Sequence, residues 1–262
     1  MADPRPVALI SAAASGIGLA VARSLVAEGY SVFTMDSNET SVHAFRAEFG
    51  ERAAVVCNVA DSQQIDTAFD SFKQAFDRLD VLVNNAGVAG PIGPVEDINV
   101  TDWQQTIDIN LNSMFYLTRL AIPLMKQQRS GAIINMSSNA GLGGCPFRSP
   151  YVASKWAAIG LAKTWAMELG AWNIRANALC PGAVNGPRID RVIQQDALAR
   201  GISTQQLRQV YEGQNSLNRF VETDDIAAMV CFLISEAGRN ISDQAIAIDG
   251  HTETLADHTL AP

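Results

Sequence analysis

Tyr151 and Lys155 stand four residues apart in the segment PYVASKW. On a helix, this spacing places two side chains on the same face, one turn apart. A phenol is a poor base near neutrality because its reference pKa is about 10, but a fixed ammonium group beside it stabilises the phenolate and lowers that pKa. The pair therefore predicts that Tyr151 exchanges protons with a substrate near neutral pH, as a general acid or base.

A run of small residues, SAAASGIG at 11–18, follows a short apolar stretch and precedes an amphipathic one. Small residues let the backbone turn tightly against a pyrophosphate, and the positive end of a following helix favours the negative charge. Turns of this composition also serve simply to pack a strand against a helix. The strand before it and the helix after it favour a dinucleotide site.

Asp36 closes the next apolar stretch, eighteen residues beyond Gly18. A carboxylate at this place can accept hydrogen bonds from the adenosine ribose hydroxyls, and it repels the 2′-phosphate of NADP. Ser15 and Ser37 stand where an arginine or lysine would be needed to neutralise that phosphate. These residues predict NAD as the cofactor, although Asp36 would equally suit the N-cap of a helix over Asn38–Phe49.

The segment NNAG at 84–87 follows a further apolar run. Asn and Gly tolerate left-handed backbone, so a turn at the end of a strand explains the motif by itself. At the carboxyl end of a parallel strand, the same turn would also face the cofactor.

The elements that must position these residues follow a regular rhythm of strands and helices. Short, β-branched apolar runs predict buried parallel strands over Val7–Ile10, Ser31–Met35, Ala53–Cys57, Val81–Val83, Ala132–Asn135, Ile174–Leu179 and Ala245–Ile248. Amphipathic or apolar helices are predicted over Gly16–Glu28, Asp61–Arg78, Thr101–Lys126 and Pro150–Leu169. The alternation predicts a single α/β domain over 1–262, with a doubly wound, Rossmann-type parallel sheet of about seven strands and helices on both faces.

The segment 185–218 departs from this rhythm because it is long, mainly polar and helical in pattern. It leaves the sheet after the sixth predicted strand, and ligands of open α/β sheets bind beyond the carboxyl ends of the strands. The segment is therefore either a lid over the substrate or a solvated pair of surface helices.

Composition limits the partners. The chain is 48% hydrophobic and 18% charged, which is typical of a globular protein with a sizeable core. Its formal net charge of −8 repels phosphate backbones, so we expect no nucleic-acid partner. We find no targeting segment and no apolar run that would span a membrane, and we expect a cytoplasmic protein. The four cysteines and three histidines are scattered, which supports neither a disulfide framework nor a metal site.

Six motifs occur in order, each at the element that its chemistry requires: the glycine turn, Asp36, NNAG, INMSS at 134–138, YVASK at 151–155 and CPG at 180–182. Each motif alone is a weak signal, whereas the ordered set is highly specific. With this set the sequence resembles the classical short-chain dehydrogenase/reductase family over essentially its whole length. The resemblance implies hydride transfer between a nicotinamide and a small secondary alcohol or ketone.

The resemblance also implies the site residues. Ser138 and Tyr151 would contact the reacting oxygen, Lys155 would lower the phenol pKa and hold the nicotinamide ribose, and Asn110 would extend a proton relay through a water. Asn58 and Val59 would contact the adenine, and Val184 the nicotinamide carboxamide. Together with the motifs above, the expected cofactor residues are Ser11, Ser15, Gly16, Ile17, Gly18, Asp36, Asn58, Val59, Asn85, Ala86, Gly87, Tyr151, Lys155, Pro181, Gly182 and Val184. A homotetramer is implied too, with the helices over Thr101–Lys126 and Pro150–Leu169 paired across a dimer interface.

The sequence departs from the family pattern at four places. Ala12 replaces the first glycine of the turn, and Asn58 replaces an aspartate at the adenine position. Asn185-Gly186-Pro187 stands where a threonine usually follows Pro-Gly, so contacts to the carboxamide would differ. His251 replaces the last glycine of an Asp-Gly-Gly motif.

The substrate is the least constrained part of the prediction. Arg148 precedes Tyr151 by three residues, and Arg188 and Arg191 begin the segment 185–218. Arginines beside a hydride-transfer site can hold a carboxylate, phosphate or sulfonate, which favours a small polar, anionic hydroxy compound or sugar derivative. We therefore name Ser138, Arg148, Tyr151 and Arg188 as candidate substrate residues. The arginines could instead lie at the protein surface or at a subunit interface.

Three other readings stay open. Leu142, Phe147 and Trp156 could line an apolar pocket for a steroid or aromatic alcohol. A non-catalytic NAD-binding sensor would keep the fold without turnover, yet it would have no need of the four proton-relay residues. An epimerase or dehydratase on this fold usually carries a larger carboxy-terminal domain than this chain has room for.

Overall fold

The computed structural model describes residues 5–252. All pairings within its sheet are parallel, and the strand order is β3-β2-β1-β4-β5-β6-β7. The strands are β1 (Val7–Ser11), β2 (Ser31–Asp36), β3 (Ala54–Val56), β4 (Val81–Asn84), β5 (Gly131–Met136), β6 (Ile174–Pro181) and β7 (Ala245–Ile248). The order reverses between β1 and β4, the switch point at which open α/β sheets bind their ligands. The predicted doubly wound, single-domain α/β fold is confirmed for the described residues.

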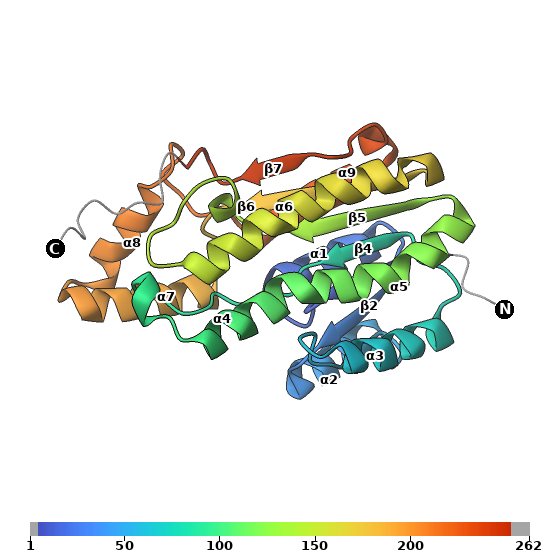
Figure 1. The fold of residues 1–262 in the computed structure, drawn as a ribbon, viewed down its shortest axis with the longest axis horizontal. Coiled ribbons are helices and arrows are strands. Elements are labelled where there is room, and N and C mark those ends of the chain that lie inside the picture. The colour runs from blue at the N-terminus through green and yellow to red at the C-terminus, as the bar shows by residue number, and fades with distance from the viewer. Residues whose placement is uncertain (1–4, 253–262) are drawn as a thin grey trace.

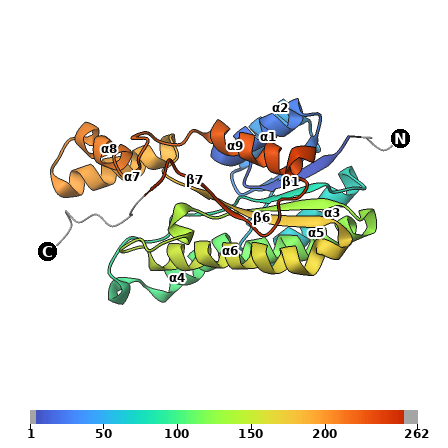
Figure 2. The same cartoon turned by 90° about the horizontal axis from the view of Figure 1, so that it is seen from above.

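Helices cover both faces of the sheet (Figure 2). One apolar layer lies between the sheet and α1 (Gly16–Ala27), α2 (Glu39–Phe49) and α9 (Thr223–Ile234). The other lies between the sheet and α3 (Ser62–Ala75), α5 (Ser113–Gln128) and α6 (Ser149–Leu169). A parallel sheet needs this double cover because its strands are apolar on both sides.

The helix predicted over Thr101–Lys126 is interrupted. The chain forms α4 (Val100–Ile107), then a π-helical turn over Asp108–Asn112, and then α5. A π turn carries one extra residue without breaking the apolar spacing on either side, so periodicity alone did not reveal it. Asn110 lies inside this turn and is fully buried. Residues 100–128 are thus helical throughout, as predicted, and the turn that departs from α geometry contains a candidate site residue.

The caps of two helices settle the roles of three polar residues. Asn38 caps α2, because its side chain accepts a hydrogen bond from the backbone N–H of Ser41 at 2.8 Å. The alternative role of Asp36 as that cap is therefore wrong. Asp61 caps α3 by accepting from the N–H groups of Gln63 and Gln64, as the sequence pattern predicts.

The segment 185–218 forms α7 (Pro187–Arg200) and α8 (Thr204–Glu212), which project beyond the end of the sheet to which the strand arrows point (Figure 1). The two helices pack on each other around Ile193, Leu207 and Phe220. Their cluster is separate from the two apolar layers that hold the sheet. The segment thus stands over the carboxyl edge on a small core of its own.

No helix within residues 5–252 combines the length and the apolarity that crossing a membrane requires.

Candidate active site

The turn from β1 into α1 has the bare backbone that a pyrophosphate needs. A Cβ atom on Gly18 would lie 2.6 Å from the Cα atom of Ala13 and 2.7 Å from the backbone oxygen of Ala12, so only glycine fits there. Gly16 has a left-handed φ of +55°. Ser15 precedes α1 and its side chain makes no capping hydrogen bond. The glycine turn and the free N–H groups at the N-terminus of α1 therefore form a site that fits a dinucleotide phosphate.

Ala12 takes the conformation of the glycine that it replaces. Its φ is +53°, in the left-handed region, which costs a residue with a Cβ atom about 1–2 kcal/mol. Hydrogen bonds hold it there: its N–H donates to the Met35 oxygen at 2.8 Å, and its oxygen accepts from the Asn85 amide at 3.0 Å. The departure from the family pattern thus leaves the turn in place.

Asp36 ends β2 directly beside this turn. Its carboxylate accepts hydrogen bonds from the N–H groups of Ala14 at 3.2 Å and Asn38 at 3.0 Å. It is 9% exposed, so it is almost enclosed by the loops around it. The acidic group therefore stands at the carboxyl edge of β2, and both neighbours that could face a 2′-phosphate, Ser15 and Ser37, are exposed and uncharged.

Ser11 and Asn85 join the ends of β1 and β4. The Ser11 hydroxyl accepts from the backbone N–H groups of Asn85 and Ala86, each at 3.0 Å. The Asn85 side-chain amide donates to the Ser11 backbone oxygen, also at 3.0 Å. These bonds hold the NNAG turn against the glycine turn, so both predicted cofactor motifs lie at one edge of the sheet. Ser11 and Asn85 act here by fixing backbone.

Tyr151 and Lys155 lie on the first turns of α6, with the ammonium nitrogen 5.6 Å from the centre of the phenol ring. The buried Lys155 ammonium donates to the backbone oxygen of Met136 at 2.9 Å, which ties it to the end of β5. The predicted helical juxtaposition of the two side chains is therefore present. The ammonium is held by the sheet and not by a carboxylate, so its full charge acts on the phenol.

The two serines after β5 have different partners. The Ser137 hydroxyl donates to the Lys155 backbone oxygen at 2.7 Å, which fastens α6 to the sheet. The Ser138 hydroxyl accepts from the Ala140 N–H at 3.2 Å and donates to the Asn139 side-chain oxygen at 3.1 Å, and it is also one of the groups that lower the pKa of Tyr151. This division of roles fits the expectation that Ser138, and not Ser137, faces the reacting oxygen.

The pKa of Tyr151 lies below the ordinary value of a phenol. Burial of the ring opposes ionisation and would raise that pKa, but the charges of Lys155, Arg188 and Arg148 and the Ser138 hydrogen bond outweigh it. Burial, with the Arg188 charge, also lowers the pKa of Lys155. The site is thus built so that a phenolate forms closer to neutral pH than it would in water.

Asn110 reaches the same site from the π turn. Its amide oxygen accepts from the Val88 N–H at 2.7 Å, and its amide nitrogen donates to the Val88 oxygen and to the Ser154 hydroxyl at 3.1 Å. A Cβ atom on Gly87 would lie 3.3 Å from the Lys155 nitrogen and 3.5 Å from the Asn110 oxygen. Gly87 therefore leaves open the space between the two groups through which a proton relay would run.

The four expected catalytic side chains and the glycine turn thus lie at one edge of a confirmed Rossmann-type sheet. The family described as enoyl-(acyl carrier protein) reductase matches residues 12–251. The trans-4-hydroxycyclohexanecarboxylate dehydrogenase of Sinomonas cyclohexanicum is 39% identical over 254 residues, which cover 93% of this chain and 91% of that protein. The chain belongs to the classical short-chain dehydrogenase/reductase family.

Two solved structures are similar to this short-chain dehydrogenase/reductase throughout. An actinorhodin polyketide ketoreductase with NADPH superposes with a TM-score of 0.89 at 30% identity, and 95% of this chain and 98% of that one are covered. An NAD⁺-bound xylitol dehydrogenase superposes with a TM-score of 0.86 at 28% identity, with 93% and 97% covered. As a member of this family, the chain is an oxidoreductase that transfers hydride between a nicotinamide cofactor and a hydroxyl or keto group.

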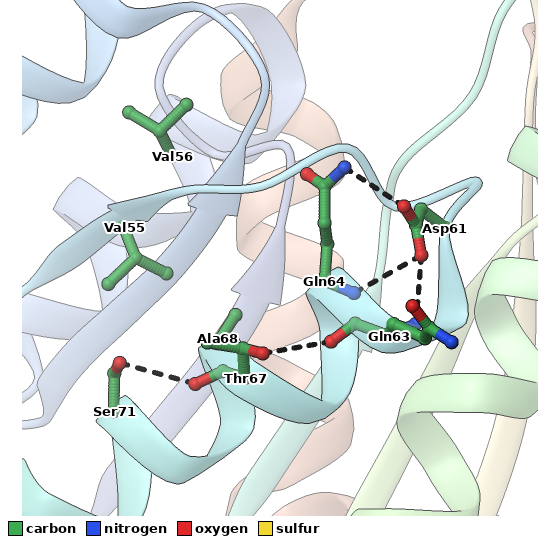
Figure 3. Close-up of a pocket in the computed structure, with 8 residues that line it drawn as sticks. All are labelled: Val55, Val56, Asp61, Gln63, Gln64, Thr67, Ala68 and Ser71. Carbon is green, nitrogen blue, oxygen red and sulfur yellow. Dashed lines mark hydrogen bonds between the residues drawn. The ribbon is translucent and has the colours of Figure 1, made fainter.

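The turn at 58–59 lies at the β3 end of the sheet, next to the depression shown in Figure 3. Gln64 accepts the Asn58 N–H at 2.9 Å and donates to the Asp61 carboxylate at 3.0 Å, so the first turn of α3 fixes the loop that would meet an adenine. This depression is lined by residues of β3 and α3 and contains none of the four expected catalytic side chains.

Pro181, Gly182 and Val184, which the sequence predicts to meet the nicotinamide, follow one another at the end of β6. Pro181 ends β6, and the Gly182 N–H donates to the Ile248 oxygen of β7 at 3.0 Å. A Cβ atom on Gly182 would lie 2.8 Å from that of Asp249, so glycine is required for the two strand ends to meet. Val184 pairs with Val221 in an isolated parallel bridge, which fixes the backbone that enters α7.

The candidate substrate residues differ in how closely they approach the phenol. The Arg148 guanidinium lies over the Tyr151 ring, 5.3 Å from its centre, and the Arg188 charge acts on both Tyr151 and Lys155. Arg191, in contrast, donates to the Pro187 oxygen within its own helix. The structure therefore places Arg148 against the phenol, whereas Arg188 reaches the site through its charge.

The three apolar candidates Leu142, Phe147 and Trp156 are all exposed. The Trp156 indole donates to the Gly143 oxygen at 3.1 Å, so it supports the loop before α6 from outside. Leu142 and Phe147 lie in that loop, between Ser138 and Tyr151.

Sequence reasoning missed two groups that hold the site together. The Met136 backbone oxygen accepts from the Lys155 ammonium, and the buried Ser154 hydroxyl donates to the backbone oxygen of Tyr151 at 2.7 Å while it accepts from Asn110. A backbone oxygen gives no signal in a sequence. Ser154 lies inside the YVASK motif, and its place one residue before Lys155 was the available clue.

Proposed function

We propose that this protein is an NAD-dependent dehydrogenase or reductase of a small, polar secondary alcohol or ketone. The observation that carries the proposal is the pairing of the Tyr151 phenol with the Lys155 ammonium, beside Ser138, at the carboxyl edge of the sheet. A sensor that only binds NAD has no use for a phenol whose pKa is lowered by several fixed charges.

Each residue has a distinct role in alcohol oxidation. The Tyr151 phenolate takes the hydroxyl proton of the substrate, and the Ser138 hydroxyl donates to the same substrate oxygen and fixes its position. Lys155 stabilises the phenolate, and Asn110 lies on the other side of Gly87 from Lys155, where a water would continue the proton relay. A bound nicotinamide would accept the hydride that leaves the carbinol carbon. Reduction of a ketone runs the same proton steps in reverse, with Tyr151 as the acid.

Asp36 supports NAD over NADP. Its carboxylate stands at the end of β2 with no arginine or lysine at position 15 or 37 to balance a 2′-phosphate. The solved relatives include one with NADPH and one with NAD⁺, so the family alone leaves the choice open. The local charge at Asp36 therefore decides our proposal.

The segment 185–218 is proposed as the lid over the substrate. Its two helices stand beyond the carboxyl edge of the sheet and share a small core that is separate from the main layers. Elements of low contact density next to a site are those that open and close around ligands. The Arg188 charge, which acts on Tyr151, comes from this segment.

We expect turnover of polar alcohols with NAD. The measurement is NADH absorbance at alkaline pH with a panel of polyols, hydroxy acids and cyclic alcohols, each run with NAD and with NADP. Signal with NADP alone would contradict the role of Asp36. NAD binding by calorimetry without turnover of any panel member would contradict the dehydrogenase and favour the sensor.

A homotetramer is proposed from exposed apolar side chains on the paired long helices. On α6, Met167 is 84% exposed and Trp156 52%, and on the neighbouring α5, Phe115 is 52% exposed. Large apolar side chains that share one helical layer mark a surface that another copy can cover.

The change of Phe115 to Arg is expected to shift the protein to a smaller assembly. An arginine buried in an apolar interface without a partner costs several kcal/mol, which exceeds what one side chain contributes to association. Light scattering after size exclusion measures the mass. The control is Val26→Arg, on α1 and 38% exposed, which should leave the mass unchanged. An unchanged mass of the Phe115→Arg protein would refute this interface.

We also propose that the protein works in the cytoplasm on a small molecule, with neither a nucleic-acid nor a membrane partner. The thiols of Cys57, Cys145, Cys180 and Cys231 are all free, which suits a reducing compartment. The net charge of −8 disfavours binding to anionic polymers and surfaces.

A further inference from the structure

Arg148 stands at the entrance to α6 with an incompletely satisfied guanidinium. Its Nε atom is buried and has no hydrogen-bond partner, and its charged plane lies over the Tyr151 ring at 5.3 Å. A buried polar donor without a partner is costly, because it gave up its hydrogen bond to water on folding. Such an atom beside a reaction centre points to a group that arrives with the ligand.

Arg188 lies on the first turn of α7, in the segment proposed as the lid. Its side chain is exposed, and its charge acts on both Tyr151 and Lys155. No described residue forms a hydrogen bond or an ion pair with it. One guanidinium group therefore lies against the phenol ring, and a second, from the proposed lid, acts on the same phenol through its charge.

Most of the other arginines in the described part of the chain are partnered. Five form ion pairs with carboxylates, namely Arg23, Arg78, Arg119, Arg208 and Arg239. Four donate to backbone oxygens, namely Arg46, Arg129, Arg175 and Arg191. In a chain with 27 acidic and 19 basic residues, carboxylates are plentiful. Arg52 and Arg219 also lack such a partner, but both are exposed to water; among the described arginines, only Arg148 has a buried guanidinium nitrogen without a partner.

We propose that Arg148 and Arg188 bind an oxyanion of the substrate, such as a carboxylate, and so restrict this site to hydroxy acids and their keto forms. The inference rests on the proposed function, because it places the anion on the molecule whose hydroxyl meets Tyr151 and Ser138. Guanidinium groups match oxyanions through paired, charge-assisted hydrogen bonds. In the complex, the anion accepts the hydrogen bond that the Arg148 Nε atom lacks. The anion is then held from α6 by Arg148 and from the lid by Arg188.

A simpler role for both arginines would be to stabilise the Tyr151 phenolate. The two roles are separable, because phenolate stabilisation acts on every substrate, whereas anion binding acts only on charged ones. Matched hydroxy acids and hydroxy amides make the distinction. Suitable pairs are lactate and lactamide, 3-hydroxybutyrate and 3-hydroxybutyramide, and 4-hydroxycyclohexanecarboxylate and its carboxamide.

The experiment compares each acid with its amide by kcat/KM with NAD, and by calorimetric binding to the NADH complex, in which no reaction can occur. We expect at least one acid to exceed its amide about tenfold or more in both measurements, the range of one hydrogen bond to a charged group. Arg148→Met and Arg188→Met should each remove most of that preference. Arg191→Met, with the same loss of charge one turn further along α7, should retain it.

The outcomes separate the two proposals. Absence of an acid preference in every pair, whether both members bind or neither does, overturns the anion site. So does a preference that survives in the Arg148→Met/Arg188→Met double variant, or an equal loss of acid and amide activity in both single variants. Preferential binding of an acid to the NADH complex without any turnover would sustain the anion site and contradict the proposed dehydrogenase.

Discussion

Replacement of Tyr151 by Phe is expected to lower kcat about 1,000-fold or more, since a positioned acid or base contributes about 10²–10⁴-fold. The substitution removes one oxygen atom and leaves the ring, which lies between the Arg148 guanidinium and the Lys155 ammonium. NADH absorbance with the best panel substrate gives the rate. Ser137→Ala is the matched control, because the Ser137 hydroxyl donates to the Lys155 backbone oxygen and has no part in the proposed proton transfer. It should retain turnover, with a lower melting temperature.

The wild-type pH profile tests the same assignment. Because the charges of Lys155, Arg188 and Arg148 outweigh burial and lower the Tyr151 pKa, the phenolate forms below the ordinary pH for a phenol. Alcohol oxidation needs the phenolate, so its rate should rise with pH and level off above that pKa, while ketone reduction should fall over the same range. A Tyr151→Phe protein with substantial turnover, or an oxidation rate that falls with rising pH, would contradict Tyr151 as the base.

The fold followed from the sequence because its parallel strands are short, β-branched runs buried on both faces. All seven predicted runs became strands of the one sheet, and their ends moved by only a residue or two. The helix over Thr101–Lys126 was predicted without its π turn, for a specific reason. Its apolar residues keep helical spacing on both sides of Asp108–Asn112. The hydrophobic periodicity therefore does not reveal the π turn that places Asn110 in the site.

The site residues likewise differ in whether the sequence reveals them. Motif residues such as Gly18 and Gly182 are recognisable because their lack of a side chain is required by contacts under 3 Å. The partners that position Lys155 and Asn110 are backbone groups of Met136 and Val88, and any residue type supplies these. The left-handed backbone of Ala12 is hidden because alanine rarely takes it, and only the hydrogen bonds around the turn hold it there.

Exchange of Asp36 for Asn is expected to reduce the ratio of kcat/KM for NAD over that for NADP by at least about 100-fold. A unit charge about 4 Å from a phosphate is repelled by about 4 kcal/mol at an effective dielectric constant of 20. The loss of a charge-assisted hydrogen bond to the ribose adds about 1.5–3 kcal/mol against NAD. The asparagine oxygen can still accept the Asn38 N–H, but its amide nitrogen cannot accept the Ala14 N–H. The ratio of the two cofactors is therefore the readout, because a change in the turn itself affects NAD and NADP alike.

The double variant Asp36→Ala/Ser37→Arg carries the argument further, because it removes the repulsion and adds a guanidinium where the exposed Ser37 now stands. It should prefer NADP outright, as judged from initial rates with each cofactor over a range of concentrations. Asp70→Asn, on the exposed face of α3, makes the same change of net charge as Asp36→Asn and should leave the ratio unmoved. If the Asp36→Asn ratio stays within about threefold of the wild type, the carboxylate does not select NAD. The discrimination against the 2′-phosphate of NADP must then come from other residues of the glycine turn.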